Sequence, residues 1–209
     1  PSLPLKGKLA FYSTGVRLRK RGIKVEKITG VCKNPLELRM SSYAIVCPQS
    51  SVIFKSFKER NKIKVYVSVI DVAASGGYYI AMAGDSIMMH PTSLVGSIGV
   101  LALKLNLEEL MGKVGVELEV VKSANKKDFM SPFRPLTEEE RALFQETIDQ
   151  YYDRFVDVVV LNRDQLDSKA VKLLADGRVY NARQALENHL VDSIGYLQDL
   201  FDLAKKELN

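Results

Sequence analysis

The sequence predicts an α/β fold with a mainly parallel sheet and flanking helices. From residue 65 onward, short runs rich in β-branched residues alternate with longer stretches whose apolar side chains recur at helical spacing. Such alternation is typical of parallel strands that are joined by helices. The chain has 209 residues, 46% of them hydrophobic, which is enough for one domain with a substantial core.

A first strand is predicted at residues 62–72 (KIKVYVSVIDV), which are rich in β-branched side chains and end at small residues. A tight turn at residues 73–77 follows it. Residues 78–83 (YYIAMA) have the pattern expected of the first turns of a helix. A strand, a sharp Ser-Gly-Gly turn and a helix are therefore expected in succession.

The next elements are shorter. Residues 86–89 (SIMM) predict a second strand, and residues 93–103 form an apolar stretch with glycines at positions 96 and 99. A small helix is expected around residues 107–114. A further strand is expected at residues 118–121 (LEVV).

A long helix is predicted to begin at a capping box. Thr137 can accept a hydrogen bond from the amide three residues later, and Glu140 can reach back to the amide of Thr137. An apolar stripe then runs to about residue 162 and is assigned to packing in the core or between subunits. Its members are Leu143, Phe144, Ile148, Tyr151, Tyr152, Phe155 and Val159. Further helices at residues 168–175, 182–188 and 197–208 would make residues 137–209 largely helical.

The first 60 residues are harder to interpret, because residues 30–51 have little clean periodicity. We expect one domain over residues 1–209, with residues 1–60 its poorly defined part. No stretch reaches the roughly 18 uninterrupted apolar residues of a membrane span. Because the chain begins at Pro1 rather than at methionine, a trimmed or processed chain is expected.

Composition argues against several classes of protein. The net charge of +5 comes from basic residues that are spread along the chain, so no nucleic-acid partner is expected. Cys32 and Cys47 could form one disulfide. They lack a CxxC motif and histidines at ligand spacing, so neither a metal site nor a cofactor is expected.

Ser75 lies at the predicted strand-to-helix turn, in the stretch AASGGYY of residues 73–79. Such a turn can direct a hydroxyl toward solvent and place the free amides of a helix N-terminus beside it. The flanking Gly76 and Gly77 would let a substrate carbonyl approach closely. An acyl-transfer nucleophile needs this arrangement, although Ser-Gly-Gly also occurs in ordinary turns.

A serine nucleophile also needs a base. The chain has two histidines, His90 and His189, and neither has a carboxylate nearby in the sequence to orient it. Lysine can serve instead when burial lowers its pKa from about 10.4 toward neutrality. Lys126 and Lys127 lie in a loop beyond a predicted strand end, where sites of α/β folds occur, although the pattern also fits a solvated basic loop.

Several motifs occur together in a fixed order along the chain. They are VAASGGYY at 72–79, LVGSIGV at 94–100, KSANKKD at 122–128, SPFR at 131–134 and ADGRVY at 175–180. In this combination the sequence resembles the signal peptide peptidase A family, bacterial serine proteases of the S49 type. The resemblance covers roughly residues 65–196.

The resemblance implies the fold shared by Clp protease and crotonase, a superhelix of β-β-α units. It also implies a Ser/Lys dyad, with Ser75 as the nucleophile and Lys127 as the general base. Lys127 is chosen over Lys126 because it directly precedes an aspartate. Ser97, in the Gly-Ser-Ile-Gly turn, corresponds to the serine that orients the lysine. The amides of Gly76 and Gly77 would contribute to the oxyanion site.

The sequence departs from the family where a second oxyanion donor is expected. The family pattern Ser-Pro-Gly-Gly appears here as Cys47-Pro48-Gln49-Ser50, so Ser50 takes the place of the oxyanion glycine. A backbone amide does not depend on its side chain, but a non-glycine residue restricts the dihedral angles and can crowd the substrate. Low activity, a local rearrangement and a sequence error all fit this departure.

These observations predict a serine endopeptidase that degrades signal peptides or other short hydrophobic peptides through an acyl-enzyme. The resemblance also implies a ring-shaped homo-oligomer and association with a bacterial membrane through a segment absent from this chain, with a soluble catalytic domain. Two alternatives remain open. One is a catalytically impaired scaffold or adaptor, and the other is a crotonase-type acyl-CoA enzyme on the same fold.

Overall fold

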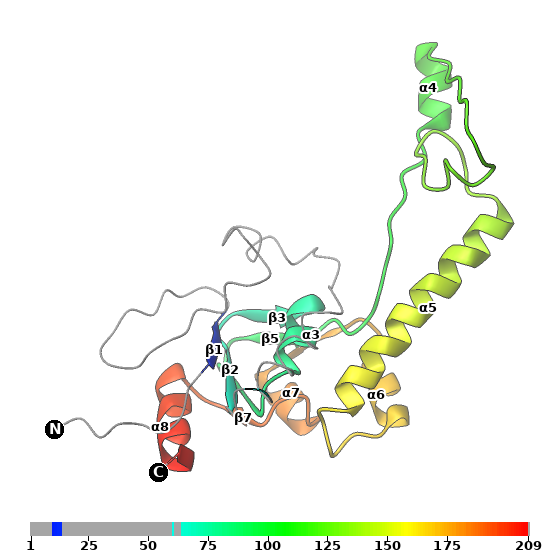
Figure 1. Ribbon diagram of the computed structural model, residues 1–209. Helices are drawn as coiled ribbons and strands as arrows, with labels where there is room; N and C mark the ends of the chain where they lie inside the picture. Colours follow the sequence, from blue (N-terminus) through cyan, green and yellow to red (C-terminus); the bar gives the residue numbers. More distant parts are fainter. Residues whose placement is uncertain (1–9, 14–59, 61–63, 209) are drawn as a thin grey trace. The chain divides into compact units, whose positions relative to one another are not determined.

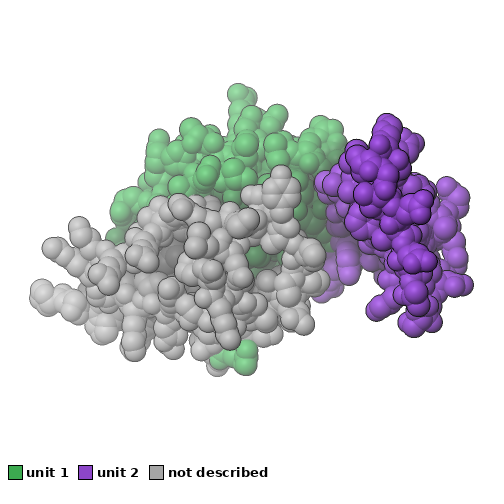
Figure 2. Space-filling model, turned by 90° about the horizontal axis from the view of Figure 1, so that it is seen from above, with its two compact units in different colours: residues 1–99, 155–209 green, residues 100–154 purple. Residues whose placement is uncertain are grey.

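The computed structural model describes residues 10–13, 60 and 64–208 (Figure 1). It divides into two compact units, one of residues 1–99 with 155–209 and one of residues 100–154 (Figure 2). This division is finer than the single domain that the sequence predicts. The first unit contains the sheets, and the second contains α4 (Glu108–Val114) and most of α5 (Glu138–Val160).

The larger sheet of the first unit has four parallel strands in the order β1-β2-β4-β7. They are β1 (Ala10–Ser13), β2 (Val65–Val69), β4 (Ser86–Met89) and β7 (Ser193–Ile194). All five residues of β2 are buried, and the strand has a neighbouring strand on each side. Near-continuous apolar strands of this kind are typical of parallel sheets.

The smaller sheet has three strands in the order β3-β5-β6. β3 (Val72–Ala74) pairs in parallel with β5 (Leu94–Gly96), and β6 (Val179–Asn181) pairs with β5 in antiparallel orientation. Of the five strand pairs in the described residues, four are parallel and one, β5 with β6, is antiparallel. The predicted α/β class with a mainly parallel sheet is confirmed.

The single strand predicted at residues 62–72 is wrong, because the structure has two strands there in different sheets. The chain bends after Val69, and its neighbour bends at the same level. The amide of His90 donates to the carbonyl of Val69 at 2.8 Å, and the amide of Leu94 donates to that of Asp71 at 3.0 Å. Because both strands bend together, their backbones stay hydrogen-bonded through the bend. The exposed Asp71 lies at this bend.

The strand predicted at residues 118–121 is also wrong, since these residues lie outside every strand of the described chain. Residues 116–120 do alternate between apolar and acidic side chains. A strand, however, requires a neighbour for its backbone groups, and within residues 64–208 none pairs with this segment.

The helix predictions are confirmed to within a few residues. α3 (Gly76–Ala81) begins two residues earlier than expected, and the remaining helices are α6 (Ser168–Leu174), α7 (Ala182–Glu187) and α8 (Leu197–Leu208). The capping box of α5 is present, because the Glu140 amide donates to Thr137 Oγ1 at 3.2 Å and the Thr137 amide donates to Glu140 Oε2 at 3.0 Å. The short strands β6 and β7 were not predicted.

The apolar stripe of α5 has two different environments along the helix. Phe155 and Val159, near its C-terminal end, are buried in the core of the first unit. Leu143 and Tyr151 belong to the second unit and are 42% and 54% exposed. The predicted packing role is confirmed for the last turns of the helix.

Helix α8 packs against the larger sheet through its apolar face. Leu200 and Ala204, both fully buried, form a cluster with Tyr66 of β2 and Met88 of β4. The Tyr66 hydroxyl also donates to Glu207 Oε2 at 2.7 Å. These contacts hold the C-terminal helix on the strands that precede the candidate site.

We expect Leu200→Ala to lower the free energy of unfolding by about 2–5 kcal/mol, because it leaves a cavity in a fully buried cluster. Urea unfolding measures the change. Leu161→Ala is the matched control, since Leu161 is 65% exposed and its truncation should change stability by no more than about 0.5 kcal/mol. Equal losses in both variants would contradict the packing of α8 described here.

Candidate active site

Ser75 lies between β3 and α3 and has a strained backbone, with φ 50° and ψ −118°. Residues other than glycine rarely adopt a positive φ, and holding one there costs about 1–3 kcal/mol. Its main chain is fixed on both sides. The Ser75 amide donates to the Gly96 carbonyl at 2.8 Å, and the Ser75 carbonyl accepts from the Tyr79 amide at 2.9 Å.

The hydroxyl of Ser75 is not used to cap α3, although the residue occupies the N-cap position. A serine at this position ordinarily accepts from an amide of the first turn. A strained serine at a sharp strand-to-helix turn is instead the arrangement that exposes a nucleophile in many hydrolases. The local geometry therefore fits the predicted role.

Two tyrosines hold α3 in place one turn after Ser75. Tyr78 is fully buried, and its hydroxyl donates to the Leu190 carbonyl at 2.7 Å. The ring of Tyr79 meets the edge of Phe155 with centroids 5.2 Å apart. Burial raises the pKa of the Tyr78 hydroxyl above its ordinary value, so this hydroxyl stays a neutral donor at physiological pH.

Gly76 and Gly77 form the first turn of α3. The first hydrogen bond of the helix runs from the Tyr79 amide to the Ser75 carbonyl. The amides of Gly76 and Gly77 come before it in the chain and therefore have no carbonyl partner within the helix. A Cβ at Gly77 would lie 3.9 Å from the Cβ of Ala73, an ordinary contact. Glycine is therefore not required there by the described neighbours.

Ser97 and Ser75 follow the carboxyl ends of two neighbouring strands of the smaller sheet. Ala74 and Gly96 are paired residues of β3 and β5, and each is followed directly by one of the two serines. Ser97 also has a φ of 50°, and its amide donates to the Arg178 carbonyl at 2.7 Å. The structure thus brings together two of the three predicted catalytic residues.

Gly96 makes the turn before Ser97 possible. Its φ is +103°, and a Cβ there would lie 2.8 Å from the ring of Tyr180 and 2.9 Å from the Arg178 carbonyl. Both the conformation and the space therefore require glycine. The role of this glycine was not predicted from the sequence, although the motif LVGSIGV contains it.

The ADGRVY motif supports the Ser97 turn from the other side. The amide of Arg178 donates to Asp176 Oδ1 at 3.1 Å, and its Nε donates to Asp176 Oδ2 at 2.7 Å. The hydrogen bonds from Arg178 lower the pKa of the Asp176 carboxyl. This closed loop presents the Arg178 carbonyl to Ser97, a function that the motif alone did not reveal.

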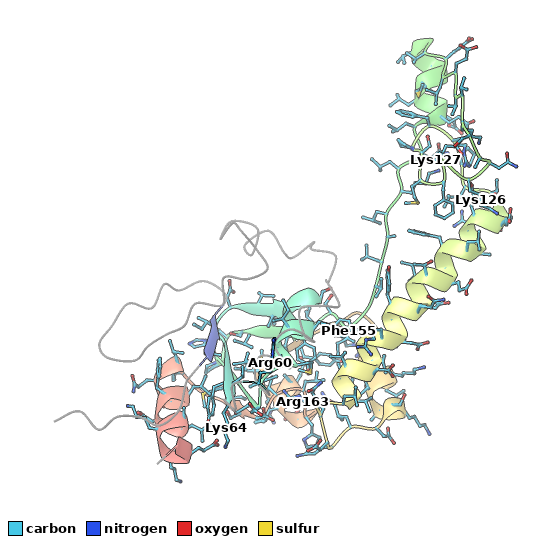
Figure 3. All side chains as sticks on the ribbon, viewed as in Figure 1. Arg60, Lys64, Lys126, Lys127, Phe155 and Arg163 are labelled. Carbon is cyan, nitrogen blue, oxygen red and sulfur yellow. The ribbon has the colours of Figure 1, made fainter. Side chains whose placement is uncertain are left out.

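Lys127 lies in the second unit, in a turn that precedes α5 (Figure 3). Its amide donates to the Ala124 carbonyl at 3.1 Å. The neighbouring lysines have carboxylate partners, since Lys122 Nζ lies 2.8 Å from Asp128 and Lys126 Nζ lies 2.5 Å from Glu139. No described hydrogen bond or ion pair within residues 64–207 involves Lys127 Nζ.

This difference bears on the choice of base, because an ion pair with a carboxylate occupies the amine of a lysine. Among the three lysines of the KSANKKD motif, Lys127 is the one without such a partner in the described part of the chain. Ser75 and Ser97 belong to the first unit and Lys127 to the second. The dyad of Ser75 and Lys127 therefore stays a prediction.

The remaining candidates have different outcomes. Ser50 lies outside the described residues, as do Gln49 and the two cysteines. His90 Nδ1 lies 2.9 Å from Thr92 Oγ1, and its ring meets Tyr196 with centroids 5.1 Å apart. His189 is exposed in the turn that follows α7. Among the described hydrogen bonds, none joins either histidine to Ser75.

The sequence model of peptidase family S49 matches residues 57–209, which is more than half of the chain. The chain belongs to peptidase family S49. Membership relates the chain to a family of peptidases and supports the predicted fold class. Within the described residues of this S49 peptidase, no helix is both long and apolar enough to cross a membrane.

Several curated proteins are similar to this S49 peptidase. The "Putative signal peptide peptidase SppA" of Enterococcus faecium is 46% identical over 155 residues, covering 72% of this chain and 45% of that protein. The "Putative protease slr0021" of Synechocystis is 40% identical over 183 residues, covering 87% and 66%. The chloroplastic serine protease SPPA of Arabidopsis thaliana is 35% identical over 146 residues, covering 69% and 21%. The chain thus spans between a fifth and two thirds of the length of these relatives.

We expect the variant Ser75→Gly of this S49 peptidase to be more stable than Ser75→Ala by about 1 kcal/mol. Glycine relieves the strain of the positive φ, worth about 1–3 kcal/mol, and this gain exceeds the 0.5–1 kcal/mol that glycine ordinarily loses relative to alanine. Because both variants lack the hydroxyl, the comparison isolates the backbone. Thermal unfolding measures it, and a less stable glycine variant would contradict the strained turn.

Proposed function

We propose that this protease is a serine endopeptidase in which Ser75 is the nucleophile and Lys127 the general base. The observation that carries the proposal is the backbone of Ser75, which holds a non-glycine residue at φ 50° directly before α3. Strain of this kind persists where the surrounding structure imposes it, and it concentrates at functional sites. Here β5 and α3 impose it through the two main-chain hydrogen bonds of Ser75.

In the proposed reaction, neutral Lys127 takes the proton of the Ser75 hydroxyl as the serine oxygen attacks a peptide carbonyl. The C–N bond then breaks, the amine leaves with the proton, and an acyl-enzyme remains. Water hydrolyses this ester with the lysine again accepting a proton. The amides of Gly76 and Gly77 are the proposed donors to the tetrahedral oxyanion, a contribution of about 3 kcal/mol where single donors have been removed from other enzymes.

Lys127 is exposed in the structure, and a lysine base works when its amine is shielded from water. We therefore expect substrate binding or contact with another protein surface to cover it. Ser97 is proposed to orient the lysine, and the sheet register supports this proposal, because Ser75 and Ser97 directly follow the paired residues Ala74 and Gly96. Its main chain is fixed by the hydrogen bond to Arg178, which limits its movement.

The proposed substrates are cleaved signal peptides or other short hydrophobic peptides. The name of the Enterococcus relative supports this substrate class. Two alternative functions are a scaffold without catalysis, which the Gln49-Ser50 departure would favour, and a crotonase-type acyl-CoA enzyme. The following experiment separates the three.

We expect a fluorophosphonate probe to label the wild-type chain, to label Ser75→Ala not at all, and to label Lys127→Ala at least about 10²-fold more slowly. The slower labelling follows because general-base catalysis typically contributes a factor of about 10²–10⁴. Mass spectrometry of the labelled protein locates the adduct. Lys126→Ala is the matched control, because it removes the adjacent lysine, which is paired with Glu139, and should label as the wild type does.

Absence of labelling, together with absence of cleavage of a fluorogenic signal-peptide substrate, would sink the peptidase proposal and favour the scaffold. Coenzyme A binding in calorimetry, with no labelling, would favour the acyl-CoA enzyme. Normal labelling of Lys127→Ala, together with loss of labelling in Lys126→Ala, would assign the role of base to Lys126.

We also propose that the chain forms a homo-oligomer and associates with a bacterial membrane through a segment outside this chain. Exposed apolar side chains of the second unit support the assembly. Many of them lie along residues 101–121: Leu101, Leu103, Leu105, Leu110, Val114, Val116, Leu118, Val120 and Val121. Soluble monomeric proteins rarely expose many large apolar side chains together, and such surfaces often serve interactions.

We expect the wild-type chain to elute as an oligomer in size-exclusion chromatography with light scattering, and Leu103→Glu to shift toward the monomer. Leu103 is 83% exposed, so the charge would disturb an interface without disturbing the core. Leu173→Glu is the matched control, because Leu173 is 73% exposed on α6 in the first unit. A monomeric wild type at all accessible concentrations would contradict the proposal.

A further inference from the structure

Arg134 joins two carboxylates at once, one on each side of its guanidinium group. Its Nε and Nη2 donate to the two carboxylate oxygens of Asp128 at 2.9 and 3.0 Å. Its Nη1 and Nη2 donate to the two carboxylate oxygens of Glu140 at 2.8 and 2.6 Å. Both contacts are therefore bidentate, the geometry in which arginine binds carboxylates most specifically.

The two carboxylates belong to two different parts of the second unit. Asp128 directly follows Lys127 in the turn, whereas Glu140 lies in the first turn of α5 and closes its capping box with Thr137. The side chain of Glu140 is 4% exposed, and that of Asp128 is 14% exposed. Arg134 thus ties the lysine turn to the N-terminal end of α5.

Other contacts of the turn add to this connection. Lys122 Nζ donates to Asp128 Oδ1 at 2.8 Å and to the Asn125 carbonyl at 3.0 Å. The ring of Phe129 meets that of Phe144 on α5 with centroids 5.6 Å apart. The two residues after Lys127 are therefore both anchored. Asp128 is held by Arg134, and Phe129 packs on α5.

The charges of this cluster persist over the pH range in which a lysine base would work. The hydrogen bonds from Arg134 and Lys122 lower the pKa of Asp128. Those from Arg134 and the Thr137 amide lower the pKa of Glu140 to about 2. Both carboxylates are therefore ionised at neutral and alkaline pH. The connection to Arg134 does not change when the activity is measured in that pH range.

We infer that Arg134 is a positioning residue, which holds the Lys127 turn on the N-terminal end of α5 through Asp128 and Glu140. This inference rests on the proposed function of Lys127 as the base. A lysine in place of Arg134 keeps the charge but cannot form two planar bidentate contacts, since an ammonium group lacks the forked geometry. The role therefore depends on the guanidinium shape and not on the positive charge alone.

The test compares Arg134→Lys with wild type in the hydrolysis of a fluorogenic signal-peptide substrate. We expect kcat to fall on the order of 10²-fold with KM within about twofold, because the base is displaced while substrate binding is kept. In Arg134→Lys, the acid limb of the profile of kcat against pH should also move to higher pH. Lys126→Gln is the matched control, since it breaks the exposed pair with Glu139 on the same turn and should leave kcat unchanged.

Asp128→Asn is the second variant, because it loosens the lysine turn and leaves the contact of Arg134 with Glu140 and the capping box of α5 intact. Hydrogen exchange of the amides of residues 123–131 gives a measurement that does not depend on activity. We expect exchange to become at least about tenfold faster in Arg134→Lys and in Asp128→Asn, and to stay unchanged in Lys126→Gln.

The outcomes separate this inference from the proposed function. If Ser75→Ala and Lys127→Ala lose labelling as expected but both Arg134→Lys and Asp128→Asn keep wild-type kcat and exchange, the positioning role is wrong and the peptidase stands. If wild type is inactive while the two variants exchange faster, the turn is held as described and the role of Lys127 fails. A fall in kcat with unchanged exchange of the turn would also overturn the inference.

Discussion

The parallel pairing of β3 with β5 fixes the position of the two serines. The register matches Ala74 with Gly96, so the next residue of each strand is a serine at the same edge of the sheet. Parallel strands that end together present the following residues on one side, which is where α/β folds build their sites. A shift of one residue in this register would separate Ser75 from Ser97 and turn their side chains to different faces.

The same pairing also sets the backbone around each serine. The Gly96 carbonyl accepts from the Ser75 amide, while the Ser97 amide donates to Arg178 on the opposite side of β5. β6 and the loop of Asp176 therefore support the site although neither contributes a side chain to it. In the second unit, the capping box of α5 gives similar support to the Lys127 turn, because the buried Glu140 both caps the helix and binds Arg134.

The sequence predicted the elements with strong local signals and missed those that depend on partners. Helix α8 and the capping box of Thr137 with Glu140 were predicted from spacing alone, because an amphipathic period and a reciprocal cap are local features. The bend between β2 and β3 was missed because β-branched residues on both sides of it suggested one continuous strand, although the exposed Asp71 lies at the bend. Ser75 and Ser97 could be named from motifs, but their adjacency needed the register. The double contact of Arg134 spans residues 128 to 140 and was not visible in the spacing, although SPFR marked its position.

The backbone of Ser75 has a consequence for how this gene would change over time. A residue that is held against its own conformational preference stays only while something other than stability selects for it. Most substitutions weaken a protein, whereas glycine at this position would relieve the strain of the positive φ. Under the proposed role of Ser75 as nucleophile, descendants that no longer need hydrolysis would therefore be expected to exchange this residue early and to keep the sheet that surrounds it. The identity of this one position in related sequences would then distinguish working proteases from chains that have been kept for another purpose.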